Sequence, residues 1–284
     1  MSENGNLFVS TSCFKKKSII DIVGDLSKIT LNIELSGGSQ YEPHLLDKLV
    51  KLKKEKGFNF LVHSYFPSPE KHFILNFADT SVQTRKFVST AVGYVKLLDI
   101  DYYSIHAGLK RDFKLKDELL YEPSGEHYFL HDIYQNEMWF RKEFPGIKLA
   151  VENSYPNNLN TETAFLTHID EIVEYLESGV NTYLLLDLGH LKVSSRILDF
   201  NYIDAVELIF EKYIDRVLEI HLSENQGKSD KHEIVYSDSI QYLLMRDYSD
   251  LIREKNINVT IEARNYSIEN ILESFTLLSK VLNK

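Results

Sequence analysis

The stretch VLEIHLSENQGKSDKHE, residues 217 to 233, decides how the rest of the chain is interpreted. Its first half is a run of β-branched and apolar side chains suited to a buried strand, and its second half is polar, with Gly227 as a turn residue. His221 ends the run, and nine residues later Asp230 and His232 supply a carboxylate and an imidazole. Such groups are the usual ligands of zinc, manganese and iron in sites without thiolates. The stretch therefore predicts a strand followed by metal ligands, although a histidine at a strand end is more commonly a hydrogen-bonded structural residue.

The same pattern of a short apolar run followed by a helical stretch recurs eight times. The other runs are Leu7 to Cys13, Ile29 to Leu35, Phe58 to Val62, Asp101 to Ile105, Lys148 to Val151, Thr182 to Leu186 and Ile257 to Ile261. The helical stretches are Lys16 to Ser27, Pro43 to Lys56, Val82 to Leu98, His131 to Phe144, Glu162 to Glu177, Tyr202 to Tyr213, Ser239 to Lys255 and Ile268 to Leu282. Alternating strands and helices predict a parallel sheet covered by helices. Eight such units predict an α/β fold with a single (β/α)8 TIM barrel.

The length of the chain fits one domain of this kind. A barrel of about 250 residues accounts for most of residues 1 to 284, which contain no composition break, linker or low-complexity tract. The least regular region, residues 109 to 134, follows the fourth predicted strand and includes Lys110 and Arg111. A long insertion after a barrel strand rises from the face where ligands bind, so this region is expected to form a lid over an anionic substrate. The alternative is a loop whose aromatic side chains cover the barrel rim.

The composition is that of an ordinary globular protein, with 43% hydrophobic and 26% charged residues. The net charge of −10 argues against broad affinity for nucleic acid or anionic membranes and favours small-molecule chemistry. The single cysteine, Cys13, excludes an intramolecular disulfide and every cysteine-rich zinc site. No run reaches the ~20 apolar residues of a membrane span, and the N-terminus lacks the pattern of a secretory signal. A soluble cytoplasmic protein is expected, and the sequence leaves its oligomeric state open.

Polar residues stand at or near the ends of the predicted strands. The candidate metal ligands among them and in the adjoining loops are His63, His106, Glu152, Asp187, His190, His221, Asp230, His232 and Glu262. Because strand ends of a barrel converge on one face, these side chains are expected to share a pocket. Clustered carboxylates repel one another unless they take up protons or bind a cation, so the set predicts at least one divalent ion. Glu34, Asn153 and Arg264 are candidate substrate contacts, and completion of a barrel layer is the alternative role of Glu34.

These residues, in this order, resemble the xylose isomerase-like TIM barrels, a superfamily of sugar isomerases, sugar epimerases and endonuclease IV (AP endonuclease family 2). The resemblance covers essentially the whole chain. Similarity to the epimerases implies one metal held by Glu152, Asp187, His221 and Glu262. Similarity to endonuclease IV implies three zinc ions, because each of its nine ligand types has a counterpart here. The segment HSYFPSPEKHFILNFAD, residues 63 to 79, is similar to the histidine, loop and Asn-Leu-Ala segment of that family.

Three segments depart from the endonuclease IV pattern. Glu152 is followed by NSYP rather than by small and glycine-rich residues, and Asp187 is followed by LGHLKVSS rather than by a Thr-Cys-His pattern. After His232 the sequence EIVYSDS replaces the expected glycines. In that family these segments shape the pocket around a DNA backbone. The resemblance therefore implies a retained metal cage with a different substrate surface, and nucleic acid is not the expected partner.

Two functions stay open at this point. The leading hypothesis is a zinc- or manganese-dependent isomerase or epimerase of a sugar or sugar phosphate, in which Glu152 and Glu262 move a carbon-bound proton that the metal acidifies. His190 and Arg264 would then hold substrate hydroxyls. The second hypothesis is hydrolysis of a phosphoester by a two- or three-metal centre, in which a metal-activated hydroxide attacks phosphorus, and the full ligand set favours it. An iron-dependent oxidation and a non-catalytic, ligand-binding barrel are the remaining alternatives.

Overall fold

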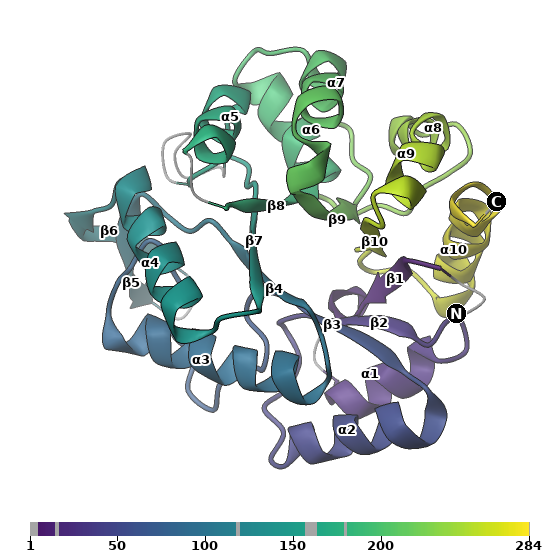
Figure 1. Ribbon diagram of the computed structural model, residues 1–284, viewed down its shortest axis with the longest axis horizontal. Coiled ribbons are helices and arrows are strands. Elements are labelled where there is room, and N and C mark those ends of the chain that lie inside the picture. The colour runs from purple at the N-terminus through teal and green to yellow at the C-terminus, as the bar shows by residue number, and fades with distance from the viewer. Residues whose placement is uncertain (1–4, 15–16, 118–119, 157–163, 179–180, 284) are drawn as a thin grey trace.

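Eight parallel strands form one sheet in the order β3-β2-β1-β10-β9-β8-β7-β4. The computed structural model describes residues 5–14, 17–117, 120–156, 164–178 and 181–283. The strands of this sheet are β1 (Leu7–Ser10), β2 (Asn32–Leu35), β3 (Asn59–Val62), β4 (Tyr102–His106), β7 (Lys148–Glu152), β8 (Tyr183–Asp187), β9 (Val217–Leu222) and β10 (Asn258–Ile261). The sheet curls into a nearly closed barrel with helices around its outside (Figure 1). This architecture confirms the predicted (β/α)8 barrel.

The seam between β3 and β4 closes the barrel through a short contact rather than a full ladder. His63 follows β3 directly and forms an isolated parallel bridge with Ser104 of β4. The backbone N–H of Ser64 donates to the carbonyl of Ser104 at 2.7 Å. The other neighbouring strands are joined by parallel ladders. A candidate metal ligand thus lies at the point where the barrel closes.

The helices connect the strands and cover the outer face of the sheet. They are α1 (Ile19–Leu26), α2 (Leu45–Lys56), α3 (Val82–Leu97), α4 (Leu130–Glu143), α5 (Ile169–Glu177), α6 (Leu188–Ile197), α7 (Tyr202–Lys212), α8 (Ile240–Asp247), α9 (Ser249–Glu254) and α10 (Ile268–Leu282), with short 3₁₀ turns at Thr11–Cys13 and Ile214–Arg216. Serine hydroxyls cap several first turns, as Ser81 does for α3 and Ser267 for α10. Within the described ranges, no helix is long and apolar enough to cross a bilayer.

Helix boundaries differ from the predictions at two places. The helix predicted from residue 162 begins at Ile169, because the ring of His168 caps it by accepting the N–H of Asp170. Residues 162 and 163 themselves lie outside the described residues. The helix predicted over residues 239–255 is divided into α8 and α9 at Tyr248, whose ring packs edge-on against Phe210 with centroids 4.5 Å apart.

A further helix, α6, begins directly after β8, where no helix was predicted. Asp187 caps it, because one carboxylate oxygen accepts the backbone N–H of His190 at 2.7 Å. The cap turns the chain sharply at the end of the strand. As a result, His190 lies beside Asp187 rather than farther along a loop.

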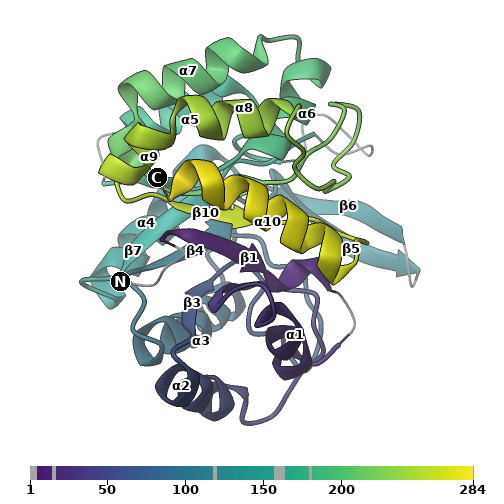
Figure 2. The same ribbon diagram turned by 90° about the vertical axis from the view of Figure 1, so that its right-hand side faces the viewer.

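The region over residues 109–134 is more regular than predicted. It contains an antiparallel hairpin formed by β5 (Arg111–Asp117) and β6 (Leu120–His127), and its last residues belong to the first turn of α4. Residues 118 and 119, at the tip, lie outside the described residues. Figure 2 shows the hairpin projecting past the barrel on the side where α10 begins, which is the side of the C-terminal strand ends. Its role as a lid stays a prediction.

Candidate metal centre

The inner face of the barrel is polar at the C-terminal strand ends. Side chains alternate between the two faces of a strand, so Glu219 and His221 of β9 both point inward. The parallel register then places Asp187 of β8 opposite His221. In the same way, His106 of β4 is paired with Glu152 of β7. Strand register therefore brings together residues that are far apart in sequence.

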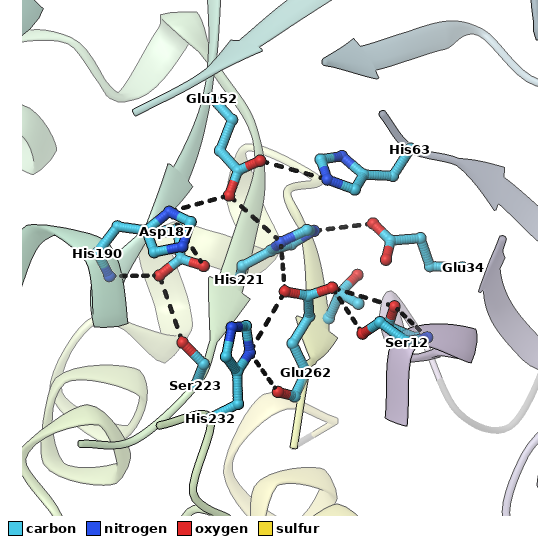
Figure 3. Close-up of polar contacts among 12 residues, drawn as sticks. Ser12, Glu34, His63, Glu152, Asp187, His190, His221, Ser223, His232 and Glu262 are labelled. Carbon is cyan, nitrogen blue, oxygen red and sulfur yellow. Dashed lines mark hydrogen bonds and ion pairs between the residues drawn. The ribbon is translucent and has the colours of Figure 1, made fainter. Parts of the chain in front are cut away.

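Glu152 lies between His190 and His63 in this polar cluster, with His221 below it in the view of Figure 3. Its Oε2 is 2.7 Å from Nδ1 of His106 and 3.3 Å from Nε2 of His63. Its Oε1 is 3.2 Å from Nδ1 of His190. Burial alone would raise the pKa of Glu152, but His106 and His63 outweigh that effect and hold the pKa well below its usual range. A carboxylate approached on both oxygens in this way is suited to bridge two cations.

Five overlapping groups of three residues among the described ones could each hold a metal ion, because one donor atom per residue lies within 4.8 Å of the others. Four groups contain only the nine candidate ligands: His63 with His106 and Glu152, Glu152 with Asp187 and His190, Asp187 with His221 and Glu262, and His190 with Asp230 and His232. The fifth group joins Glu34 to His63 and His221. All nine side chains are buried except that of His106, which is 48% exposed and lies at the mouth. Binding of ions at these groups stays a prediction.

Unpartnered donor atoms show that the residues fit divalent cations. Within the described part of the chain, the buried atoms without a hydrogen-bond partner include both Glu152 carboxylate oxygens, Asp187 Oδ2, His221 Nδ1, Asp230 Oδ1 and His232 Nε2. A buried polar atom without a partner costs free energy unless an ion or a water molecule supplies one. Carboxylate and imidazole donors in this mixture suit zinc, manganese or iron.

Two histidines of the cluster, His63 and His232, are held through the ring nitrogen that faces away from it. His63 Nδ1 is 3.0 Å from the hydroxyl of Ser104, and His232 Nδ1 is 2.8 Å from the backbone carbonyl of Glu262. Because a carbonyl only accepts, the His232 proton lies on Nδ1, which leaves Nε2 free, 2.6 Å from Asp230. Histidines that ligate metals usually have their second nitrogen fixed in this manner.

The loop after β9 folds back over the strand end, as predicted. Glu224 and Glu233 form an antiparallel bridge with backbone hydrogen bonds of 2.9 and 2.7 Å. Lys192 of α6 donates to the Glu224 carboxylate and ties the loop to that helix. Burial would raise the pKa of Asp230, but the imidazoles of His190 and His232 beside it lower it instead.

The residues predicted to contact substrate lie in different environments, some beside the cluster and some bonded to other parts of the protein. The side-chain amide of Asn153 braces Asp187, donating to its carbonyl at 3.0 Å and accepting its N–H at 2.8 Å. Arg264 has a buried Nε without a partner among the described residues. Lys110 donates to Glu171 of α5. Arg111 is exposed at the start of β5, and Glu34 is fully buried inside the barrel.

Two features of the site were missed by sequence reasoning. Ser10 and Ser12 donate to Oε1 of Glu262 at 3.2 and 2.8 Å, which joins the first strand to the last. Tyr155 packs its ring 4.8 Å from that of His190. The polar sequence STS at the end of β1 was an available signal for the first feature. The NSYP departure after Glu152 was the signal for the second.

Comparisons with known proteins establish the fold family. No family model matches the sequence, and no curated protein matches it either. Among solved structures, a D-tagatose 3-epimerase-like protein has 18% identity and a TM-score of 0.67, with 98% of this chain and 97% of that chain covered. A xylose isomerase domain-containing protein from Salmonella typhimurium has 13% identity and a TM-score of 0.64, with coverage of 100% and 99%.

A third solved structure extends the similarity to an enzyme with a stated sugar substrate. A 3-keto-D-glucoside 4-epimerase from E. coli has 12% identity and a TM-score of 0.64, with 97% of this chain and 99% of that chain covered. Such identities establish a shared fold and leave the activity to be argued from the site. The chain therefore has the fold of the xylose isomerase-like TIM barrels.

Proposed function

We propose that this protein is a divalent-metal-dependent enzyme that hydrolyses a phosphoester of a small, sugar-containing molecule. The observation that carries the proposal is that nine side chains supply four overlapping groups of three donors, which is more than one ion requires. A proton transfer assisted by one ion needs four ligands, and it gives no role to His63, His106, Asp230 or His232. Divalent ions held by these groups would polarise a phosphoryl oxygen, lower the pKa of water and stabilise the charge of a leaving oxygen.

The chain's own residues support the binding of an anionic group beside the ions. Arg264 lies three residues after the end of β10, and its buried Nε has no partner in the described structure. Because a guanidinium keeps its charge and offers several donors in one plane, it is suited to hold phosphate oxygens. Tyr155 limits the space near His190, where its ring lies 4.8 Å away. This crowding, with the acidic net charge of −10, favours a small substrate over a DNA backbone.

Sugar isomerisation or epimerisation is the second candidate, and a specific observation favours it. The similar structures include a sugar epimerase and proteins named after sugar isomerases and epimerases. Under this candidate, Glu152, Asp187, His221 and Glu262 hold one ion, and Glu152 and Glu262 move the proton. The contacts of Glu152 argue against it, because a carboxylate with imidazoles on both oxygens and a depressed pKa is a weak base.

Metal content and product analysis separate the two candidates. We expect protein purified without added metal to contain two or three ions per chain, with a separate anomalous scattering peak for each ion among the nine side chains. We also expect release of phosphate or alcohol from sugar phosphodiesters and phosphomonoesters, without deuterium entering carbon positions in D₂O. One ion beside Glu152 and Glu262, together with deuterium incorporation into a sugar, would establish the epimerase instead.

A further inference from the structure

His221 lies inside the barrel between carboxylates on both of its ring nitrogens. Its Nε2 is 2.8 Å from Oε2 of Glu34 and 3.4 Å from Oε1 of Glu219. Its Nδ1 is 3.7 Å from Oε2 of Glu262 and 3.9 Å from Oε1 of Glu152. Glu34 comes from β2, which is separated from β9 by β1 and β10 in the sheet, so its side chain reaches His221 across the lumen (Figure 3).

The two carboxylates at Nε2 are not equivalent. Glu219 accepts hydrogen bonds from the hydroxyls of Tyr102 at 2.9 Å and Thr260 at 2.5 Å, so its charge is compensated without His221. Within the described residues, His221 is the one hydrogen-bond partner of the Glu34 side chain, and Glu34 Oε1 has none. Among the described residues, the side chain of Glu34 therefore has its single hydrogen-bond contact at His221 Nε2.

We propose that Glu34 is a positioning residue for the metal ligand His221, and not the substrate contact expected from the sequence. This inference rests on the metal centre in the proposed function. Because Glu34 holds the His221 proton on Nε2, the lone pair of the ring is on Nδ1. Nδ1 is the atom that faces Glu262, and it has no hydrogen-bond partner in the described structure. The Glu34 side chain contacts Nε2 of His221, whereas Glu152 and Glu262 lie toward Nδ1, so the His221 ring stands between Glu34 and these two carboxylates.

The test compares Glu34→Leu, which removes the acceptor, with Glu34→Gln, whose amide oxygen can still accept from Nε2. Zn²⁺ affinity is measured on folded protein by competition with a chelator, and the number of bound ions is measured in parallel. We expect Glu34→Leu to weaken the affinity about 10- to 100-fold, the usual effect of losing a partner of a ligating histidine. Glu34→Gln should recover most of that loss, and both variants should keep the wild-type number of ions.

The matched control is Glu137→Leu, because Glu137 is another buried carboxyl, hydrogen-bonded to Tyr175 and outside the metal centre. It should leave Zn²⁺ affinity unchanged, which separates ligand positioning from the general cost of replacing a buried glutamate. Loss of one bound ion in Glu34→Leu would make Glu34 a ligand and overturn the proposal. Unchanged affinity with a raised Michaelis constant would make it a substrate contact and overturn the proposal as well.

The tautomer of His221 gives a readout that does not depend on metal. In metal-free protein with ¹⁵N-labelled histidine, at a pH high enough to leave one proton on the His221 ring, whose pKa the surrounding carboxylates raise, NMR should show that proton on Nε2 in the wild type and in Glu34→Gln. It should show a mixture of tautomers in Glu34→Leu. A proton on Nδ1 in the wild type would overturn the positioning role even if the protein binds metal. Failure of the wild type to bind Zn²⁺ would overturn the proposed function, while the tautomer result would still decide the role of Glu34.

Discussion

Glu262 connects the first strand of the barrel to the metal centre, which makes it the most informative single residue to change. Its Oε1 accepts from Ser10 and Ser12, while its Oε2 faces His221 and His232, each at 3.7 Å. Burial would raise the pKa of Glu262, but the neighbouring His221 and His232 lower it instead. The carboxylate is therefore charged and aimed between two ligand groups.

We expect Glu262→Gln to reduce metal affinity by about tenfold or more and to reduce activity with it, because the variant loses a charged oxygen donor. The amide oxygen can still accept from Ser10 and Ser12, so the fold should be retained. Metal analysis and turnover of the same preparation measure the two losses, and circular dichroism checks that the fold is retained. Full metal content with full activity would remove Glu262 from the centre.

For single residues, the sequence predicted which side chains lie together at the strand ends but not which partner each one contacts. Residue type and position at a strand end were sufficient for His63, Glu152 and Asp187. The surroundings of Glu34 and Lys110 were not predictable, because their partners His221 and Glu171 are distant in sequence and reach them only through the fold. A polar side chain at a strand end gives no sign of whether it faces the ligand or a buried neighbour.

Among the elements, the β5–β6 hairpin offers a direct test of the predicted lid. Lys110 at its base is bound to Glu171 and lies 5.6 Å from the ring centroid of Phe165, whereas Arg111 is exposed. We expect Arg111→Ala to raise the Michaelis constant of a phosphorylated substrate several-fold more than that of its neutral analogue. Lys110→Ala should affect both substrates equally, because its charge is already paired. If Arg111→Ala changes the Michaelis constants of both substrates equally, the hairpin is part of the barrel rim and not a lid for an anionic substrate.

A second test concerns α4, which carries a buried carboxyl far from the metal centre. Burial raises the pKa of Glu137 from its ordinary 4.5 to about 7. Between these values the folded chain holds a proton that the unfolded chain has lost, so stability falls as the pH rises through this window. We expect Glu137→Gln to be more stable than the wild type by about 1–3 kcal/mol at pH 8 and equal to it near pH 4.

Urea unfolding at several pH values checks this prediction, with Glu174→Gln on the exposed face of α5 as the control. The control should show no pH-dependent difference from the wild type, because the side chain is solvated in both states. A constant difference between Glu137→Gln and the wild type across the range would contradict the raised pKa.

The elements themselves were predicted well where hydrophobic periodicity was long and poorly where a single cap decided the outcome. α10 and seven of the strands lie at or close to where the pattern placed them, whereas the strand predicted over Leu7 to Cys13 ends at Ser10, because Thr11–Cys13 form a 3₁₀ turn capped by the Ser10 hydroxyl. The start of α5 and the existence of α6 depend on His168 and Asp187 bonding to backbone N–H groups. Both bonds reach only two or three residues along the chain, so they were local signals that hydrophobic periodicity does not register.

For the whole molecule, metal and stability should be linked. An ion that binds only the folded state stabilises it by about 2.7 kcal/mol when its free concentration is 100 times Kd. We expect chelation to lower the melting temperature by roughly 5–10 °C and re-addition of metal to restore it. Scanning calorimetry with and without chelator measures the shift. An unchanged melting temperature in protein shown to have lost its metal would argue that the groups bind no ion tightly.

The short contact between β3 and β4 links ion binding to local opening of the barrel. β3 and β4 are joined by the bridge between His63 and Ser104. The donor atoms of His63 and His106 lie within 4.8 Å of each other beside this bridge. An ion held by these two histidines would connect the strands across the seam, where they lack a ladder. The amide of Ser64, which crosses the seam, should then exchange with solvent more slowly in the metal-loaded protein than in the apoprotein. Binding of an ion by His63 and His106 would therefore also close the barrel between β3 and β4.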